Sequence, residues 1–327
     1  MEAELLNCKA IEIDELKTQN YENIKSKLLE NNENFEDPLF PKNFTSIGQV
    51  DDRPELAEVK WMRVGEIAQK MGKKPVLFTN GAKSSDIVQG KVKDCWFLAA
   101  LGDLPNKPKL FNRVMPTDQE LDMSKGPGIF YFKFWQYGEW VEVVVDDYLP
   151  TLEDLPCMLK SSSPNEFWPC MLEKAYAKLY GNYTYALQGG VIGSALDDLT
   201  GGMTESYFKQ EGLPTFQVML RAFEKGAMMG ASIFGRVGQG RSDVSSTGLA
   251  NFHAYSITKV VEFESGGETH QLLRVRNPWG DHVEWIGNWS DNSKKWDDLT
   301  ETEKLKIGYK KEYDGEFFIS YKDFIKV

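Results

Sequence analysis

The chain of 327 residues is poor in cysteine, with four residues, and has no uninterrupted apolar run of about 18 residues. Scarce cysteine without the tight spacing of a disulfide framework favours a reducing compartment, so we expect a cytoplasmic protein. The missing apolar run excludes a transmembrane helix. Residues 1–16 have neither a basic start nor an apolar centre, and they therefore predict no secretory signal.

Positive charge is also scarce. The sequence has 38 Lys and Arg against 49 Asp and Glu, which gives a formal net charge of -11 at pH 7. Phosphate binding needs a basic surface, so this balance predicts no nucleic-acid partner. An excess of carboxylates suits hard cations such as calcium instead. Gly-x-Ser-x-Gly, Walker, His-Glu-x-x-His, Cys-x-x-Cys and linear EF-hand motifs are all absent, which excludes the functions they carry.

The length exceeds what one hydrophobic core usually supports, and it predicts two domains or one large composite. The densest glycine segment, residues 188–202, is the best candidate for a boundary. We therefore expect an N-terminal helix and extended connector over 1–45, a first subdomain over 46–200 and a second over 201–327.

Periodicity predicts more helix in the first part of the chain and more strand after the glycine-rich segment. Expected helices cover 11–30, 95–104, 166–180 and 214–226. Aromatic and β-branched runs predict a hairpin from 128–135 and 139–145. Further strands are expected at 229–234, 254–263, 271–276 and 316–321.

Cys95 is the candidate nucleophile. It opens a predicted apolar helix, and backbone N–H groups and the dipole at a helix start favour a thiolate over a thiol. The sequence has three histidines, and His270 and His282 lie in polar, turn-like contexts that suggest solvated bystanders. The remaining cysteines (Cys8, Cys157 and Cys170) are interpreted as structural.

His253 is the candidate base, because it opens one predicted strand while Asn277 closes the next. A turn at residues 265–268 would fold the two strands into a hairpin, which brings these far ends within about two or three residues of register. An amide beside an imidazole can orient the ring, as in Cys-His-Asn hydrolysis. Gln89 lies six residues before Cys95 and could supply an oxyanion donor together with the Cys95 amide.

These residues lie in motifs that resemble the calpains, calcium-dependent proteases related to papain. The motifs are residues 89–100 (QGKVKDCWFLAA), 253–256 (HAYS), 276–280 (RNPWG) and 284–291 (EWIGNWSD). The resemblance extends to residues 35–41, 134–140, 145–150, 166–168, 172–178 and 314–317, and so covers nearly the whole chain.

The resemblance implies an α+β papain-like cysteine protease core of two subdomains. One would be mainly helical and carry Cys95 and Gln89, and the other β-rich and carry His253 and Asn277, with the active-site cleft between them. Trp279 would shield the catalytic pair and gate the cleft when calcium is absent. The implied function is a calcium-regulated intracellular cysteine endopeptidase that makes limited cleavages in protein or peptide substrates.

The resemblance also implies two calcium ions in the core. The ligands that it indicates for the first ion are the carbonyls of Thr79 and Gly81 and the carboxylates of Asp86 and Glu166. Those that it indicates for the second ion are Glu284, Asp291, Asp314, Glu316 and the Glu312 carbonyl. The sequence leaves open whether the chain is a fragment whose further domains or regulatory subunit are missing.

Two departures from the family pattern leave an alternative open. Lys93 and Phe252 stand where the family usually has glycine, directly before Asp94-Cys95 and before His253. Either side chain could crowd a substrate, so the alternative is a catalytically impaired, calcium-binding calpain homologue that acts as a scaffold or regulator. A transglutaminase also pairs Cys and His for acyl transfer, but Asn rather than Asp at position 277 counts against that reading.

Overall fold

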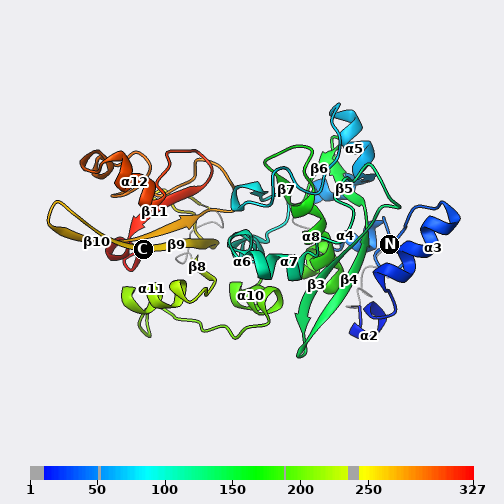
Figure 1. The fold of residues 1–327 in the computed structure, drawn as a ribbon, viewed down its shortest axis with the longest axis horizontal. Coiled ribbons are helices and arrows are strands. Elements are labelled where there is room, and N and C mark those ends of the chain that lie inside the picture. The colour runs from blue at the N-terminus through cyan, green and yellow to red at the C-terminus, as the bar shows by residue number, and fades with distance from the viewer. Residues whose placement is uncertain (1–10, 51–52, 188, 235–242) are drawn as a thin grey trace. The chain divides into compact units, whose positions relative to one another are not determined.

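The structure is a computed structural model that describes residues 11–50, 53–187, 189–234 and 243–327 (Figure 1). Cys8 lies outside these residues. The chain forms two compact units. Unit 1 comprises residues up to Asp94 together with Pro108–Gly190 and Asp197–Gly202, and unit 2 comprises Cys95–Lys107, Val191–Leu196 and Met203–Val327. Within the described ranges, no helix has the length and apolarity needed to cross a membrane.

Unit 1 is built around a β-hairpin and a buried helix. Strands β3 (Ile129–Gln136) and β4 (Glu139–Asp146) pair antiparallel and are joined at Tyr137 and Gly138, which have φ of 49° and 91°. Positive φ at both central residues is the geometry of a type I′ turn, which matches the twist of the strands. All twelve residues of α8 (Trp168–Leu179) are buried, so this helix forms the centre of the unit.

The remaining elements of unit 1 surround this centre. α3 (Tyr21–Asn31) lies against β3, and Tyr21 stacks on Tyr131 at a centroid distance of 4.4 Å. The other elements are α2 (Ile13–Leu16), α4 (Phe44–Ile47), η1 (Pro54–Glu58), β1 (Lys60–Arg63), α5 (Val64–Lys70), η2 (Ser84–Asp86), β2 (Ile87–Val88), α7 (Pro108–Val114), β5 (Tyr148–Leu152), β6 (Leu155–Pro156), β7 (Lys160–Ser161) and α9 (Tyr183–Leu187). β1, β5 and β6 form a small sheet, and β2 pairs with β7.

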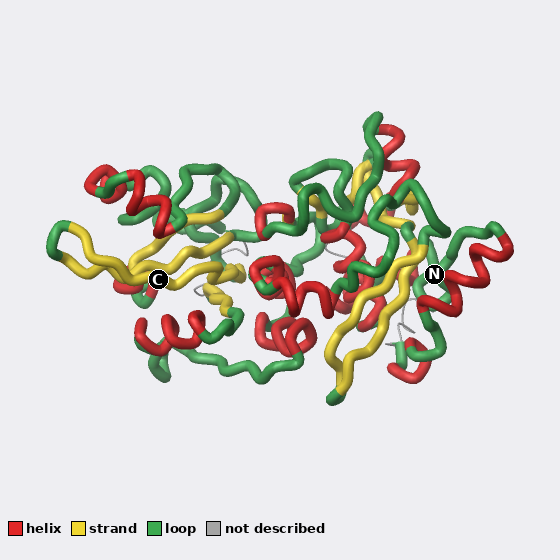
Figure 2. The backbone as a smooth tube through the Cα atoms, in the orientation of Figure 1, coloured by secondary structure: helices red, strands yellow, loops and turns green. Residues whose placement is uncertain are grey.

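Unit 2 contains a four-stranded antiparallel sheet in the order β11-β10-β9-β8, drawn in yellow in Figure 2. Its strands are β8 (Met229–Ile233), β9 (His253–Ser265), β10 (Glu268–Arg276) and β11 (Glu316–Ser320). Gly266 and Gly267, with φ of 63° and 80°, form the two-residue turn between β9 and β10. The register shifts by one residue between Arg274 and Val275, where Thr258 is the extra residue on β9.

Two apolar clusters support this sheet. One includes Phe216 and Met219 of α11 (Phe216–Glu224) with Tyr255 and Val275 of the sheet. The other includes Trp289, Trp296 and residues of α12 (Glu301–Ile307). α6 (Cys95–Leu101) lies against β8 and β9. The unit also contains η3 (Leu104–Asn106), η4 (Lys294–Asp298) and α13 (Tyr321–Phe324), and α10 (Ile192–Thr200) is divided between the units.

The expected α+β class is confirmed, as are the 128–145 hairpin, the helices at 166–180 and 214–226, and all four strands of the second half. The single helix expected over 11–30 is wrong, because α2 ends at Leu16 and α3 begins at Tyr21. The Asn20 side chain accepts a hydrogen bond from the Asn23 amide, and this cap starts a new helix. The glycine-rich segment, expected to be a boundary, contains α10, and the division between the two units falls after Gly190 and again after Gly202. The three-part division of the chain remains a prediction.

Candidate functional site

His253 and Asn277 form a direct hydrogen bond, 2.7 Å between Nε2 and Oδ1. His253 is the first residue of β9, and Asn277 follows the last residue of β10. Arg276 pairs with Ser256, which places Asn277 about two residues of register from His253. The hairpin expected from the sequence therefore brings the two side chains together.

The Asn277 amide is held in one orientation. Its Nδ2 donates to the Val283 carbonyl at 2.9 Å, and its Oδ1 also accepts from the Trp279 amide at 3.0 Å. A carbonyl can only accept, so Oδ1 must face the imidazole and Nε2 of His253 must carry the hydrogen. Nδ1 of His253 is then the nitrogen that can accept a proton.

The imidazole of His253 is packed between aromatic rings. Trp279 lies at a centroid distance of 4.5 Å with an interplanar angle of 41°, and Tyr255 lies edge-on at 5.0 Å. His253 is 4% exposed. Burial lowers the pKa of His253 to about 4, against smaller upward effects of the Asn277 hydrogen bond and the Asp281 charge. The ring is therefore neutral at pH 7 and able to act as a base.

Cys95 is the first residue of α6 and is half-buried. α6 is fixed to the sheet of unit 2, because Ser256 Oγ donates to the Ala99 carbonyl at 2.7 Å. A Cβ at Gly102 would lie 2.3 Å from the same Oγ, so glycine permits this close approach. The charge of Cys95 contributes to raising the pKa of Tyr255, after the larger effect of burial. Cys95 thus belongs to the same unit as His253. Its charge acts on Tyr255, whose ring lies beside the imidazole of His253.

The other described cysteines have unreactive surroundings. Burial raises the pKa of Cys157 to about 12 and also raises the pKa of Cys170. A thiolate is the reactive form, so neither thiol is suited to nucleophilic attack. Their interpretation as structural residues agrees with this environment.

Gln89 lies in a loop of unit 1, and hydrogen bonds to two groups of the same loop hold its side-chain amide. Its Nε2 donates to the Val92 carbonyl and to Asp94 Oδ1, both at 3.0 Å. A Cβ at Gly90 would lie 1.6 Å from the Met158 carbonyl oxygen, so only glycine fits there. The amide is thus directed by two acceptors of its own unit.

Phe252, which replaces the usual glycine of the family pattern, adopts a left-handed backbone with φ of 49°. Glycine adopts this conformation without cost, whereas a residue with a Cβ is strained in it. The Phe252 side chain is 43% exposed. An exposed aromatic ring therefore stands directly before the candidate base. Lys93, the other departure, is half-buried, and its carbonyl accepts from the Gly189 amide.

The first group of candidate calcium ligands is already bonded within unit 1. Glu166 accepts from the Thr79 amide at 2.5 Å and from Ser161 Oγ at 2.6 Å, and Asp86 accepts from the Lys83 amide and from Trp168 Nε1. Burial raises the pKa of Glu166, and the Asp86 charge raises it further. Gly81, whose carbonyl completes this group, has a φ of 82°.

The second group contains two buried carboxylates of unit 2, Glu284 and Asp291, on which the charges of the half-buried Asp314 and Glu316 act. Glu284 Oε1 accepts from the Gly315 amide, and Asp291 Oδ2 accepts from the Glu312 amide. Burial raises the pKa of Glu284 to about 7, and the Asp291 charge adds to it. Burial and the charges of Asp314 and Glu316 likewise raise the pKa of Asp291 to about 7.

The chemistry of these donors fits a cation that prefers oxygen ligands. As they stand, however, no three Asp, Glu, His or Cys side chains among the described residues lie close enough together to hold a metal ion. The candidate ligands therefore stay a prediction.

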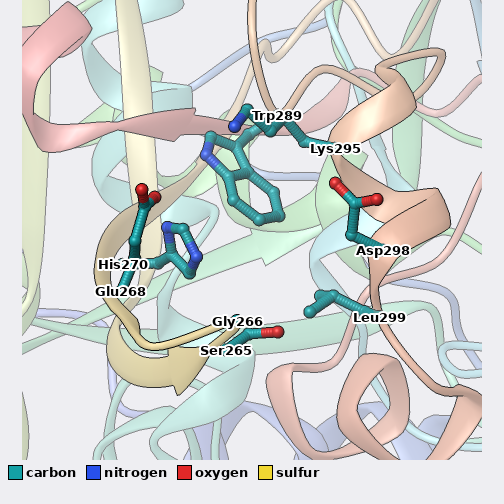
Figure 3. A pocket seen from close by; sticks show the side chains of 8 residues that line it. All are labelled: Ser265, Gly266, Glu268, His270, Trp289, Lys295, Asp298 and Leu299. Carbon is teal, nitrogen blue, oxygen red and sulfur yellow. The ribbon is translucent and has the colours of Figure 1, made fainter.

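A shallow cavity of about 290 Å³ lies elsewhere on unit 2 (Figure 3). Ser265, Gly266, Glu268, His270, Trp289, Lys295, Asp298 and Leu299 line it. His270 is half-buried between Phe263 and Trp289, each at a centroid distance of 5.1 Å, so it is a packed ring rather than the solvated bystander expected. His282 is exposed, as expected.

Sequence reasoning missed two features of this region. The Val283 carbonyl, which fixes the Asn277 amide, left no signal because a carbonyl has no side-chain identity. The second is Glu173, whose carboxyl interacts with that of Asp94 beside Cys95. A glutamate on a helix that is buried on all sides was the available signal, since such a residue needs a partner.

Comparison with known proteins gives consistent matches. Residues 35–327 match the model of the calpain family cysteine protease. The chain is 42% identical over 311 residues to calpain clp-1 of Caenorhabditis elegans, which covers 94% of this chain and 38% of that protein. It is 42% identical over 310 residues to calpain-B of Drosophila melanogaster, covering 93% and 32%. It is 39% identical over 312 residues to the calpain-1 catalytic subunit of Rattus norvegicus, covering 94% and 43%. The chain thus spans less than half the length of these relatives.

Proposed function

Because the chain belongs to the calpain family of cysteine proteases, we propose that it is a cysteine endopeptidase with a Cys95–His253–Asn277 triad. The observation that carries this proposal is the 2.7 Å bond between His253 Nε2 and Asn277 Oδ1. Because the Asn277 amide donates to the Val283 carbonyl and its oxygen faces His253 Nε2, Nδ1 of His253 is the nitrogen that can accept the Cys95 proton. The family match also supports the papain-like identity of the α+β fold.

The proposed chemistry is acyl transfer to a thiol. Nδ1 of His253 takes the Cys95 proton, and the thiolate attacks the carbonyl carbon of a peptide bond. The Cys95 amide donates to the oxyanion, and Gln89 Nε2 donates to it with the hydrogen that the Val92 carbonyl accepts in the structure, while its other hydrogen stays bonded to Asp94 Oδ1. The C–N bond then breaks, the imidazolium protonates the leaving amine, and a thioester remains on Cys95. Water activated by His253 hydrolyses the thioester and restores the thiol.

Trp279 supports this chemistry by its position. Its ring lies 4.5 Å from that of His253, and its amide donates to the oxygen that Asn277 presents to the imidazole. The ring therefore excludes water from one side of the His253–Asn277 bond. In a less polar surrounding that hydrogen bond is electrostatically stronger and orients the base more firmly.

Calcium is part of the proposal as a regulator. Thr79, Gly81, Asp86 and Glu166 would hold one ion, and Glu284, Asp291, Glu312, Asp314 and Glu316 a second. When bound, the ion supplies positive charge to carboxylates that repel one another in the structure, as the raised pKa values of Glu284 and Asp291 indicate. The proposed setting is the cytoplasm, and the proposed substrates are proteins or peptides cleaved at a limited number of sites.

The test is hydrolysis of casein and of a fluorogenic peptide across a calcium titration. Four proteins are compared: the unchanged chain, Cys95→Ala, Asn277→Ala and, as a matched control, Cys157→Ala. Cys95→Ala should abolish turnover, and Asn277→Ala should lower kcat by about 100-fold or more, since the imidazole loses its orientation. Cys157→Ala should retain turnover, because burial raises the pKa of that thiol to about 12.

Equal rates for the unchanged chain and Cys95→Ala would rule out Cys95 as the nucleophile. Turnover that is independent of calcium would keep the triad and remove the calcium regulation. Isothermal titration calorimetry with calcium provides a readout that does not require activity, and Asp291→Asn should weaken the binding it detects.

One observation favours a second candidate function. The exposed Phe252 ring stands before His253 on a strained backbone where the family pattern has glycine. If it blocks the substrate, the chain is a calcium-binding homologue that acts as a scaffold or regulator. Calcium binding without hydrolysis in the unchanged chain, together with hydrolysis in Phe252→Gly, would support this second function.

A further inference from the structure

Asp94 and Glu173 form a buried pair of carboxyl groups in unit 1, and each is 1% exposed. The two side chains interact with each other, yet Asp94 Oδ2 and Glu173 Oε1 receive no donor hydrogen from any other group that the structure describes. Two carboxylates can only accept hydrogen bonds. The contact between these oxygens is therefore favourable only when one of them carries a proton.

No cation compensates this pair in the described part of the chain. The titratable groups that act on Glu173, or on which it acts, are Asp94, Cys157, Cys170 and Tyr183. All four are acids that are neutral or negative. The Leu159 amide donates to Glu173 Oε2 at 2.9 Å and accounts for the other oxygen of that carboxyl. A shared proton is the remaining way to satisfy both groups.

The pair is linked to the proposed oxyanion donor. Asp94 Oδ1 accepts from Gln89 Nε2 at 3.0 Å, and the Val92 carbonyl accepts from the same nitrogen at the same distance. Val92 cannot donate from its carbonyl, so Nε2 rather than Oε1 must face this side. Both hydrogens of Nε2 are bonded in this arrangement, so the amide donates to an oxyanion by releasing the Val92 carbonyl and keeping its bond to Asp94 Oδ1. The direction of the Gln89 amide thus depends on where Asp94 Oδ1 is held.

We propose that Glu173 is a positioning residue for hydrolysis: by sharing a proton with Asp94, it holds Asp94 Oδ1 in place and so directs the Gln89 amide. This inference rests on the proposed function for its catalytic meaning, since Gln89 is there the oxyanion donor. Glu173 itself does not touch the reacting atoms. Glu173 lies on α8, which is buried on all sides. Because this helix is held by its packing, Glu173 can hold Asp94 and the loop that carries Gln89 in one position.

The shared proton makes the arrangement dependent on pH. Burial raises the pKa of Asp94 to about 7, and burial and the Asp94 charge raise the pKa of Glu173 well above its usual value. Both groups bind protons more tightly in the folded chain than in the unfolded chain. Their stabilising contribution is therefore complete below the ordinary pKa values of 3.8 and 4.5, and it is lost progressively as the pH rises from there through about 7, the pKa of Asp94, and on toward the higher pKa of Glu173.

Glu173→Gln and Glu173→Leu separate a positioning role from simple packing. The glutamine side chain of the first variant can donate from its amide to Asp94 Oδ2 and accept from the Leu159 amide, so it replaces the protonated acid and leaves a single carboxyl. The leucine side chain of the second variant offers no donor. At pH 6.5 Glu173→Gln should keep kcat within about threefold, whereas Glu173→Leu should lose about 100- to 1000-fold in kcat, the range for losing an oxyanion donor, with little change in KM.

Three pH profiles test the proton itself. Between pH 6.5 and 9 the unchanged chain should lose kcat and thermal midpoint, and Glu173→Gln should lose less of both. The Gln89 side-chain amide signal, followed by NMR with ¹⁵N-labelled glutamine, should shift with pH in the unchanged chain and stay constant in Glu173→Gln. The midpoint and the NMR signal require no activity.

The outcomes distinguish this inference from the proposed function. If the unchanged chain hydrolyses nothing, the proposed function fails, and the midpoint and NMR profiles still decide whether the proton is shared and directs Gln89. Identical pH profiles for the unchanged chain and Glu173→Gln would overturn the inference even with full hydrolysis. If Glu173→Leu does not fold, Asp94→Asn provides an independent check: its amide donates to Glu173 without a titrating proton, so it should keep kcat at pH 6.5 and flatten the profiles as Glu173→Gln does.

Discussion

Units 1 and 2 bury carboxylates in two different ways. In unit 1, Lys178 Nζ donates to Asp37 Oδ2 at 2.6 Å, and Lys174 pairs with Asp146, with all four side chains at most 2% exposed. In unit 2, Glu284 and Asp291 are 7% and 5% exposed and have other carboxylates as neighbours. The first arrangement is neutral within the chain, whereas negative charge predominates in the second, where the Lys311 charge offsets only part of the effect of burial and of the other carboxylates on Asp291.

The difference shows which buried charges serve the fold and which are suited to a ligand. A buried ion pair with complete hydrogen bonding needs nothing further. Buried carboxylates that repel one another destabilise the fold unless a proton or a cation joins them. The Asp94–Glu173 pair shows that unit 1 also contains one such arrangement. Four predictions test this distinction.

Lys178→Met should have the largest effect on stability. Lys178 Nζ also donates to Gln19 Oε1 and to the Val144 carbonyl, so its removal leaves Asp37 buried without a cation. We expect the free energy of unfolding, measured with urea, to fall by about 3–5 kcal/mol. The matched control is Lys17→Met, whose 2.6 Å pair with Glu139 is exposed to solvent, and its loss of stability should be much smaller. Equal losses would show that burial does not decide the contribution.

Asp291→Asn should raise the free energy of unfolding, whereas Lys178→Met should lower it. Without calcium, the variant removes one charge from a repelling group, so we expect stabilisation on the order of 1 kcal/mol. Calcium should raise the midpoint of the unchanged chain, because a ligand that binds the folded state stabilises it, and raise that of the variant less. Asp297→Asn, at an exposed position, is the control and should do neither. Destabilisation by Asp291→Asn without calcium would contradict the comparison.

His253 is a buried base, and it can be compared with the buried carboxylates because burial is the largest influence on its pKa. Burial lowers the pKa of His253 to about 4, whereas the unfolded chain titrates near its ordinary value of 6.5. The unfolded state therefore binds more protons between these values, and stability should fall as the pH drops from 6.5 to 4. NMR of the His253 ring should show a neutral imidazole above pH 5 or so. Asn277→Ala should lower the pKa further, and an unperturbed titration would refute the assignment.

The sequence predicted the His253–Asn277 contact because one hairpin determines it. Two strands joined by Gly266-Gly267 need only a register, and a bulge of one residue did not separate their ends. Cys95 and Gln89 were identified from the sequence motif around them. The residues that contact their side chains were not predicted. Gln89 is directed by Asp94, and that contact depends on Glu173, which is 79 positions farther along the chain than Asp94.

Short elements and long-range contacts account for what the sequence did not predict. α5, α7 and α12 are seven residues each, too short for a clear period of 3.6. Lys174 and Lys178 of α8 are buried because Asp146 and Asp37 approach them from other elements. Local pattern carries no information about such partners. Charge burial in this chain is therefore a property of its tertiary structure.

The smallest expected change in stability comes from relieving backbone strain at one residue in each unit. Tyr137 in unit 1 and Phe252 in unit 2 both have φ of 49°. Replacement by glycine relieves a left-handed strain of about 1–2 kcal/mol and costs about 0.5–1 kcal/mol of unfolded-state entropy. Tyr137→Gly and Phe252→Gly should thus both stabilise by roughly 0.5 kcal/mol in urea unfolding. Only Phe252→Gly should change the KM for peptide, because only Phe252 adjoins the candidate base. An equal change of KM in Tyr137→Gly would mean that the effect of Phe252 is on stability alone.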